Sequence, residues 1–205
     1  MRRFKFLFLF ALISISSFSQ ISTIKDRINK IIQNKNAGIG VAILDLNSNE
    51  SVVINGEEHF PMQSVFKFPI VLKVLNDVDK DKITLGDSIF ISSAELKKKT
   101  WSTIQEKYPN GNVKIALSDI IYYTIALSDN IGCDVLLKNY GGTSSVNHYL
   151  KSIGIENMTI KRNEAEQHSK PDTQYDNWAT PNEAINLLTM FYRNSLLKPT
   201  TQRFL

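Results

Sequence analysis

The sequence predicts an α+β protein in which a short helix-and-hairpin segment precedes a long helical region. Three observations lead to this fold class. Isoleucines recur at helical spacing near the start of the chain, at Ile21, Ile24, Ile28, Ile31 and Ile32. Two strand-like segments, Gly38–Leu46 and Ser51–Ile54, flank a polar turn and indicate a β-hairpin. From Ser64 to Asn194 the apolar pattern is almost entirely helical.

The helical region can be divided further. A helix follows Ser64 and tolerates Pro69, because proline fits the early turns of a helix. A later helix starts at Thr180, a capping residue followed by proline and, after three positions, by glutamate. Between them lies Asn157–Trp178, a long polar segment without periodicity, and ordered loops of this length are usually functional. Four more helices are expected at Leu85–Lys98, Lys114–Leu127, Ile131–Asn139 and Thr143–Ile153.

Residues 1–19 have the pattern of a secretory signal peptide. Arg2, Arg3 and Lys5 form a basic start, residues 6–15 are apolar, and small residues predict cleavage before Gln20. The apolar run is too short to span a bilayer, so we expect a secreted or periplasmic protein without a membrane anchor. Removing this segment lowers the net charge from +4 to about +1, which leaves no sign of a nucleic-acid partner.

The metal-binding residue types give no sign of a metal or cofactor. The single Cys133 excludes an internal disulfide and a cysteine-based zinc site. His59, His148 and His168 are remote from one another in sequence and lack ligand spacing. Cys133 stands in an apolar helical segment, so we expect a buried structural thiol and no bound cofactor.

Ser64-Val65-Phe66-Lys67 is the first motif that carries chemistry. Its spacing places a hydroxyl and an amine one helical turn apart on the same side. In that geometry an amine can take the hydroxyl's proton and make serine a nucleophile. The same spacing at Ser22–Lys25 belongs to an ordinary amphipathic segment. Lys67 instead lies in an apolar stretch, where burying its charge is costly and favours its use as a base.

Ser128-Asp129-Asn130 lies between two expected helices, where a loop can turn into a cleft. Together with Ser64-x-x-Lys67 it resembles the motif set of the serine β-lactamase and penicillin-binding protein superfamily. The string Gln63–Ile70 is similar to the extended-spectrum, cephalosporin-hydrolysing branch of class A β-lactamases. The resemblance covers nearly the whole chain after residue 19. It implies a two-domain fold in which a helical domain is inserted into an α/β domain.

The resemblance also implies roles for these residues. Ser64 would be the acyl-accepting nucleophile, with Lys67 in its proton network. Ser128 would relay a proton to the departing lactam nitrogen, and Asn130 would hydrogen-bond to substrate and to Lys67. Asp129 would tie the loop to neighbouring backbone. The alternatives are structural, because serine and aspartate at these positions are also the residue types that cap helices.

The long loop contains two carboxylates, Glu164 and Glu166, and one of them would be the deacylating base of a class A enzyme. In the family an arginine stands two residues before that glutamate, so Arg162 selects Glu164, whose carboxylate would activate a water. Glu166 is expected to be solvated. His168 stands where most class A enzymes have an asparagine that helps to hold the water, and it is expected to contact substrate.

Two further positions are interpreted through the resemblance. The aspartate that usually pairs with the loop arginine is replaced by Asn177, with Asp176 beside it. We therefore expect the ion pair to be lost, the loop to fold differently and the site to be wider. Trp101 resembles the aromatic residue at the cleft rim that contacts substrate, with core packing as the alternative.

The function implied by the resemblance is hydrolysis of β-lactam antibiotics, both cephalosporins and penicillins, by a monomer, and hence antibiotic resistance. One alternative is a penicillin-binding D,D-peptidase, which would be acylated but deacylate slowly. The loop around Glu164 argues against it. The other is a non-enzymatic β-lactam-binding sensor, and the expected lack of a membrane segment or partner domain argues against that.

The chain is expected to consist of the signal peptide 1–19, a helix and hairpin of the α/β domain at 20–62, and an all-helical domain at 63–205. The third family motif, Lys-Thr-Gly on a late strand, does not occur in the sequence. In the family the chain returns to the sheet after the helical domain, whereas this one stops at Leu205. We therefore expect a truncated sequence with an incomplete α/β domain.

Residues 20–205 expressed alone are accordingly expected to fold poorly and to give no useful β-lactam hydrolysis. The hairpin at 38–54 would have unpaired edges. The missing strand would also supply the second oxyanion donor, and losing one such donor typically costs about 10²–10³ in rate. A nitrocefin assay on the purified fragment measures this, and turnover near that of a full-length relative would contradict the expectation.

Overall fold

The computed structural model describes residues 23–97 and 99–205, so the expected signal peptide lies outside the described residues. The chain forms two compact units, one ending at Glu58 and the other running from His59 to Leu205. Strand β3 (Phe60–Pro61) belongs to the second unit. Within the described residues, no helix is long and apolar enough to cross a membrane.

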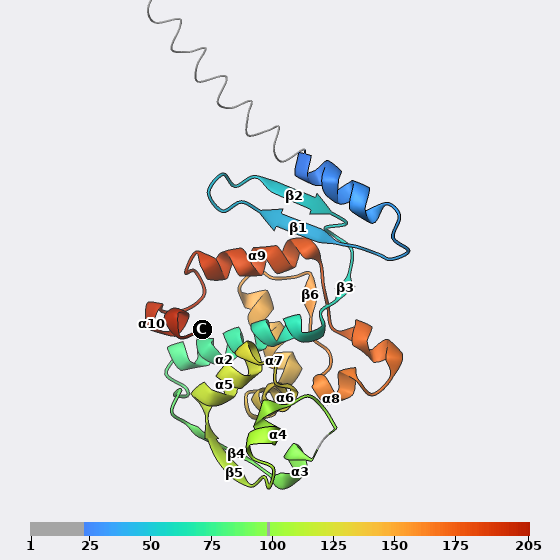
Figure 1. The fold of residues 1–205 in the computed structure, drawn as a ribbon. Coiled ribbons are helices and arrows are strands. Elements are labelled where there is room, and N and C mark those ends of the chain that lie inside the picture. The colour runs from blue at the N-terminus through green and yellow to red at the C-terminus, as the bar shows by residue number, and fades with distance from the viewer. Residues whose placement is uncertain (1–22, 98) are drawn as a thin grey trace, which may run out of the picture. The chain divides into compact units, whose positions relative to one another are not determined.

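The first unit contains a helix over 23–32 and an antiparallel hairpin of β1 (Val41–Leu44) and β2 (Ser51–Ile54), as the sequence predicts (Figure 1). Asp45 closes the turn of this hairpin, where its carboxylate accepts a hydrogen bond from the backbone N–H of Asn47 at 2.8 Å. That bond lowers the pKa of the Asp45 carboxyl, because it stabilises the charged form.

The second unit is rich in helices and contains two small sheets. Strands β3, β7 and β6 form one sheet in that order, and β4 and β5 form a separate hairpin. Its elements after β3 are, in chain order, η1 (Gln63–Phe66), α2 (Lys67–Asp79), β4 (Ser88–Ile91), α3 (Ser93–Leu96), α4 (Thr103–Lys107), β5 (Val113–Ala116), α5 (Leu117–Ala126), α6 (Asn130–Asn139), α7 (Gly142–Ser152), β6 (Met158–Thr159), α8 (Glu164–Gln167), η2 (Pro171–Asp176), β7 (Trp178–Ala179), α9 (Pro181–Tyr192) and α10 (Pro199–Phe204).

Helix α2 is the centre of the second unit. Its side chains Ile70, Leu72 and Leu75 are almost fully buried, and α5, α6 and α7 pack around it (Figure 1). Pro69 lies in its first turn, where the missing N–H has no helical partner to lose. Because Lys67 is the first residue of α2, this packing fixes one functional side chain against the core.

The expected helices at Leu85–Lys98 and Lys114–Leu127 are wrong in part, and the region after residue 63 also contains strands β6 and β7. Residues Ser88–Ile91 form β4 and Val113–Ala116 form β5, and the two strands pair antiparallel. Side chains of β4 alternate between exposed and buried, with Ile89 and Ile91 inward, which is the period of a strand. Helix α5 therefore begins only at Leu117. The pairing joins segments distant in the sequence, so a local apolar pattern cannot reveal it.

Helices α5 and α6 approach each other closely at Gly132. A Cβ atom at this position would lie 2.6 Å from Thr124 Oγ1 and 3.3 Å from Ile104 Cδ1. Thr124 has little freedom to move, because it is buried and its hydroxyl donates to the Ile120 carbonyl at 2.7 Å. Glycine is therefore required here by the distance between two helices.

Gly132→Ala is expected to lower the free energy of unfolding by about 1–3 kcal/mol, the usual cost of overpacking a core. Thermal denaturation of the complete gene product measures the change. In a domain of this size, each kcal/mol lowers Tm by roughly 2–4 °C. Gly86→Ala is the matched control, since its Cβ would meet its nearest neighbour only at 3.8 Å. Equal losses of stability in both variants would contradict the argument.

Candidate active site

Ser64 lies in η1, the single turn that leads directly into α2. Lys67 Nζ donates to Ser64 Oγ at 3.2 Å. The capping alternative for Ser64 is wrong, because α2 has Phe66 as its N-cap residue and no side-chain cap. Ser64 is exposed, so its hydroxyl is accessible from solvent.

The Lys67 ammonium is surrounded by oxygen atoms although its side chain is only 3% exposed. An ammonium donates three hydrogen bonds at a time, so four hydrogen-bond acceptors share its protons, and the Glu164 carboxylate adds an ion pair. A buried ammonium is tolerated only with such compensation. The five oxygens are Ser64 Oγ at 3.2 Å, Ser128 O at 2.8 Å, Ser128 Oγ at 3.1 Å, Asn130 Oδ1 at 2.6 Å and Glu164 Oε1 at 2.8 Å.

Ser128 brings a second hydroxyl to Ser64. It lies in the turn between α5 and α6 with a left-handed backbone, φ 56°, which costs about 1–3 kcal/mol where a side chain is present. The next residue holds this turn, since the Asp129 N–H donates to the Tyr123 carbonyl at 3.0 Å. As a result Ser128 Oγ donates to Ser64 Oγ at 2.9 Å, and two motifs 64 residues apart meet.

Asp129 ties the Ser128 turn to its surroundings, as the sequence analysis expected. The residue is fully buried. Its carboxylate accepts from the Ser102 hydroxyl at 2.9 Å and from the backbone N–H groups of Ile104 and Gly132, both at 2.8 Å. It therefore caps α6 and holds the start of α4 against it.

Asn130 is the first residue of α6 and presents its amide oxygen to Lys67. Because an ammonium needs an acceptor, the amide nitrogen must face the other way, and it donates to Thr100 Oγ1 at 2.7 Å. Thr100 could not be predicted from the sequence, because no local pattern relates it to a residue thirty positions later.

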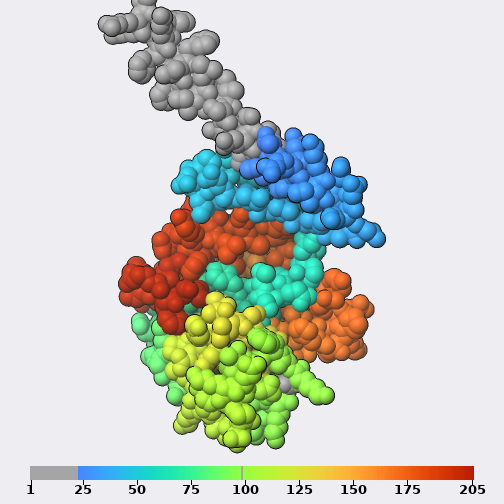
Figure 2. Space-filling model, viewed as in Figure 1, coloured from blue at the N-terminus to red at the C-terminus, as the bar shows by residue number. Residues whose placement is uncertain are grey.

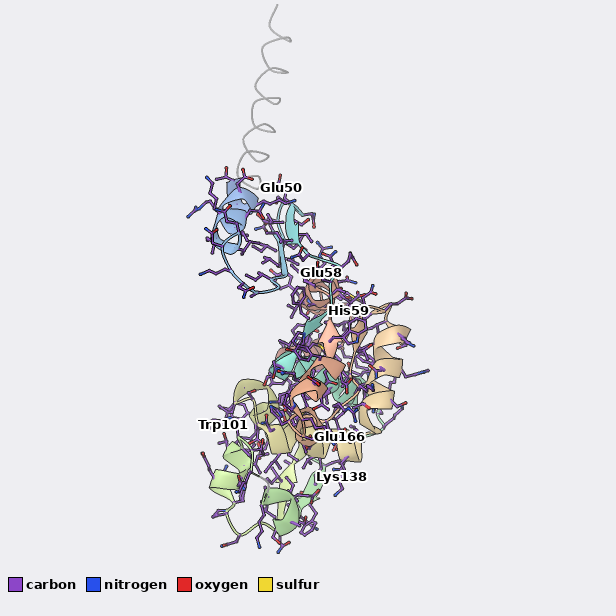
Figure 3. The ribbon with its side chains drawn as sticks, turned by 90° about the vertical axis from the view of Figure 1, so that its right-hand side faces the viewer. Glu50, Glu58, His59, Trp101, Lys138 and Glu166 are labelled. Carbon is purple, nitrogen blue, oxygen red and sulfur yellow. The ribbon has the colours of Figure 1, made fainter. Side chains whose placement is uncertain are left out.

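Trp101 flanks the Ser128–Asn130 motif at the surface. Its side chain is 61% exposed, so the core-packing alternative is wrong. The indole N–H donates to the Leu127 carbonyl at 3.1 Å, and the Trp101 carbonyl accepts from the Asn130 N–H at 3.1 Å. The ring is thus held beside the motif by one hydrogen bond to backbone, and the Trp101 backbone is held by another (Trp101 is labelled in Figure 3).

Glu164 is the buried carboxylate of the site. Its side chain is 3% exposed, and Oε1 lies 2.8 Å from Lys67 Nζ. It begins the short helix α8, and its backbone N–H donates to Asp134 Oδ1 at 2.7 Å. Asp134 stands one helical turn after Asn130 on α6, and this spacing in the sequence indicates that both side chains lie on the same face of the helix.

Glu166 is exposed and has a different task (labelled in Figure 3). Its carboxylate accepts from the Asn163 N–H at 3.2 Å, while Asn163 Oδ1 accepts from the Glu166 N–H at 2.8 Å. This reciprocal pair is a capping box, which closes the start of α8. The carboxylate of Glu166 is therefore engaged in helix capping at the surface, and Glu164 alone of the two faces Lys67.

His168 borders Glu164. Its Nδ1 lies 2.8 Å from the Glu164 carbonyl oxygen and 3.5 Å from Glu164 Oε2. The ring is 59% exposed. It is thus placed next to the buried carboxylate while remaining open to solvent.

The expected loss of the loop ion pair is wrong. Arg162 Nε lies 2.8 Å from Asp176 Oδ2, and this hydrogen bond, with the charge of Lys161, lowers the pKa of Asp176. Asn177 is fully buried. Its Oδ1 accepts from the N–H groups of Lys161 and Arg162 at 2.8 Å, and its Nδ2 donates to Arg162 O and Gln167 Oε1. The neutral amide of Asn177 thus occupies the buried position. The carboxylate that pairs with Arg162 belongs to Asp176, which is more exposed to solvent.

Cys133 is fully buried, as expected for a structural thiol. Burial raises the pKa of the thiol well above its usual value, and the nearby Glu164 carboxylate adds to this effect. The thiol therefore stays neutral and does not compete with Ser64 as a nucleophile.

The structure brings together five residues that the sequence analysis selected: Ser64, Lys67, Ser128, Asn130 and Glu164. An exposed hydroxyl beside a buried amine–carboxylate pair can lose its proton as it attacks a carbonyl group. A second hydroxyl can then pass a proton to a leaving group. These are the groups that a serine acyl-transfer reaction requires.

The comparisons with known proteins give the family. The model of the beta-lactamase enzyme family matches residues 23–205, and the chain belongs to this family. Beta-lactamase VEB-1 of Pseudomonas aeruginosa is 44% identical over 178 residues, which are 87% of this chain and 59% of the relative. Extended-spectrum beta-lactamase PER-1 of the same organism is 32% identical over 197 residues, 95% of this chain and 64% of the relative.

Solved structures agree with this assignment. The crystal structure of TLA-1 extended-spectrum beta-lactamase has a TM-score of 0.86 at 38% identity, covering 90% of this chain and 67% of that one. A class A beta-lactamase from Bacteroides cellulosilyticus gives a TM-score of 0.82 at 37% identity, covering 90% and 66%. The resemblance to extended-spectrum class A enzymes is thereby confirmed. The chain spans about three-fifths of the length of the curated relatives, 59% and 64%.

Asn177→Ala is expected to destabilise the loop, since four hydrogen bonds to a buried amide are lost. Leaving buried polar groups unpaired costs about 1–3 kcal/mol each. The loop should then open more often, so trypsin should cleave after Lys161 or Arg162 faster than in the unmodified protein. Limited proteolysis followed by mass spectrometry measures the rate.

Asp176→Ala is the matched control at the neighbouring position. It removes a partly exposed ion pair, and such pairs are worth about 0–1 kcal/mol. Cleavage should therefore accelerate much less than in Asn177→Ala. If the two variants were cleaved equally fast, the buried amide would not be what holds the loop.

Proposed function

We propose that the complete gene product hydrolyses β-lactams, cephalosporins and penicillins alike, through an acyl-enzyme on Ser64. The observation that carries the proposal is the contact of 2.8 Å between Lys67 and Glu164, next to the exposed Ser64 hydroxyl. Membership of the beta-lactamase enzyme family supports it. Such an activity would confer resistance to β-lactam antibiotics.

In the acylation step, Ser64 Oγ attacks the lactam carbonyl and gives up its proton. If the ammonium of Lys67 first passes a proton to Glu164, its free amine can accept the proton of Ser64 at 3.2 Å. Glu164 acting through a water is the other route to the same intermediate. The lactam C–N bond then breaks, and the nitrogen takes a proton from Ser128, which is replenished from Lys67 at 3.1 Å.

Before deacylation the proton held by Glu164 returns to Lys67 across their contact of 2.8 Å, which restores the carboxylate. In the deacylation step, a water attacks the ester carbonyl and Glu164 takes its proton. The bond between carbonyl carbon and Ser64 Oγ breaks, and the returning proton restores the hydroxyl. Glu164 suits this role because it is buried beside Lys67, whereas Glu166 is occupied in a surface capping box. Asn130, Trp101 and His168 are proposed to contact the substrate around this centre.

The two alternatives require an acyl-enzyme that persists. A penicillin-binding D,D-peptidase and a β-lactam sensor would both keep the acyl group on Ser64, for which a carboxylate poised to activate water is a disadvantage. The position of Glu164 therefore favours hydrolysis over either. We further propose a monomer that needs no cofactor and is exported to the periplasm, on the pattern of residues 1–19.

Glu164→Gln in the complete gene product is expected to acylate with a cephalosporin but to release product far more slowly. The amide keeps the shape of the side chain but cannot take a proton from the water, and loss of such a base typically costs about 10²–10⁴ in rate. Mass spectrometry of the intact protein after mixing should show a persistent adduct, and digestion should place it on Ser64.

Glu166→Gln is the matched control, an identical change two residues away on the same turn. It should hydrolyse the cephalosporin at nearly the unmodified rate and accumulate little adduct. An adduct that persists in Glu166→Gln but not in Glu164→Gln would reverse the assignment of the two carboxylates. Absence of any adduct in the unmodified protein, together with absence of hydrolysis, would refute the proposed function.

A further inference from the structure

The end of α2 and the start of α7 border a cavity of about 550 Å³ that the chemistry above does not use (both helices are labelled in Figure 1). Pockets for small-molecule ligands have volumes of about 300–1,000 Å³. The lining comes from residues between 73 and 82 and from residues between 141 and 152. Within the described chain, no lining side chain makes a hydrogen bond or ion pair with Ser64, Lys67 or Glu164. The cavity is therefore separate from the candidate active site.

Positive charge dominates the lining of this cavity. Lys73 and Lys82 donate to the Asp77 carboxylate at 2.7 Å and 3.2 Å. Burial alone would raise the pKa of Asp77, but these two bonds lower it, so the carboxylate stays charged. Lys80 is exposed and has no ion pair among the described residues. With His148 neutral, three lysines against one carboxylate leave the lining a net charge of +2.

The first turn of α7 adds to this positive potential. Its N-cap residue is Gly141, which offers no side-chain cap, and the turn contains no acidic residue. The first N–H groups of a helix have no partner within the helix, and the helix dipole places partial positive charge there. Ser144, an exposed residue in the same turn, brings a hydroxyl group to the lining. The second side of the cavity thus also favours an anion.

Tyr149, which lines the cavity from α7, carries a buried hydroxyl without a partner. The residue is only 6% exposed, and its hydroxyl has no hydrogen-bond partner among the described residues. A buried phenol usually has such a partner. Burial, with the charge of Asp79, raises the pKa of Tyr149 to about 12, so the hydroxyl stays protonated and can donate. An anionic ligand would supply the missing acceptor.

The groups around the cavity are held in place by bonds within the protein. The Tyr140 carbonyl accepts from Lys73 Nζ at 2.5 Å and from Ser145 Oγ at 2.9 Å, which ties the start of α7 to α2. The Asp79 carboxylate at the end of α2 accepts from the Lys198 N–H at 2.7 Å. Figure 2 shows the red atoms of α10 next to the light green atoms that follow α2. A site that needs little ordering binds its ligand at a smaller entropy cost.

We propose that this cavity binds the phosphate group of a soluble small molecule. A phosphate monoester carries a charge of about −1.5 to −2 at pH 7 and has three strong acceptor oxygens. The charge matches that of the lining, and the oxygens can accept from Lys80, from the N–H groups of α7 and from the Tyr149 hydroxyl. A single carboxylate would leave part of the positive charge unbalanced. The site does not depend on the proposed hydrolysis, since it lies apart from Ser64.

The test is calorimetric titration of the complete gene product with inorganic phosphate, in buffers that hold the ionic strength constant with chloride. The unmodified protein should bind phosphate. Lys80→Gln should weaken this binding about tenfold, because a hydrogen bond to a charged group is lost. Tyr149→Phe keeps the ring, removes only the hydroxyl, and should weaken binding about two- to tenfold.

Lys114→Gln is the matched control, because it removes the same charge from an exposed lysine on β5, outside the cavity. This variant should bind phosphate with the unmodified affinity. Without phosphate, Tyr149→Phe should have at least the Tm of the unmodified protein, since it removes a buried hydroxyl that has no partner. A merely structural role of the hydroxyl would lower Tm instead.

Vesicles of phosphatidylglycerol test a lipid as the source of the phosphate group, with phosphatidylcholine vesicles as the blank. Co-sedimentation with phosphatidylglycerol vesicles, without binding of free phosphate, would overturn the assignment to a soluble ligand. Three results would refute the site itself: phosphate that binds no better than chloride, equal losses of affinity in Lys80→Gln and Lys114→Gln, or an unchanged affinity in Tyr149→Phe.

Discussion

The rest of the site depends on the buried contact between Lys67 and Glu164. Taking an ammonium and a carboxylate out of water is costly, and the pair is tolerated only where further hydrogen bonds compensate it. The oxygens that do so belong to Ser64 in η1, to Ser128 in the turn before α6 and to Asn130 at the start of α6. Burial of one amine thus draws the nucleophile, the proton relay and the loop carboxylate to the same point.

A second layer of buried polar groups holds the segments that supply these oxygens. Asp129 fixes the turn of Ser128, and Asn177 fixes the loop that carries Glu164. Asp129 accepts hydrogen bonds from N–H groups in the first turns of α4 and α6, and Asn177 accepts them from the irregular segment before α8. N–H groups at these places have no partner within their own helix or strand. The positions of the oxygens around Lys67 therefore depend on Asp129 and Asn177, although neither side chain is one of the reacting groups.

Short-range relations could be predicted from the sequence, and long-range ones could not. The spacing of Ser64 and Lys67 and the capping role of Thr180 follow from helical geometry within one turn. By contrast, the pairing of β4 with β5 and the bond from Asn130 to Thr100 join distant segments that no local pattern links. The loop ion pair could not be predicted from the resemblance either. The carboxylate that pairs with Arg162 stands at Asp176, one position before the place where the family has it.

The choice between Glu164 and Glu166 shows how a spacing argument can rest on an indirect physical cause. The sequence argument used Arg162, two residues earlier, yet its guanidinium pairs with Asp176 on the returning end of the loop. That pair and the amide of Asn177 close the loop, and the loop then starts α8 at Glu164. Residues two apart on a helical turn point to different sides. Once the capping box turns Glu166 outward, Glu164 is left facing the ammonium.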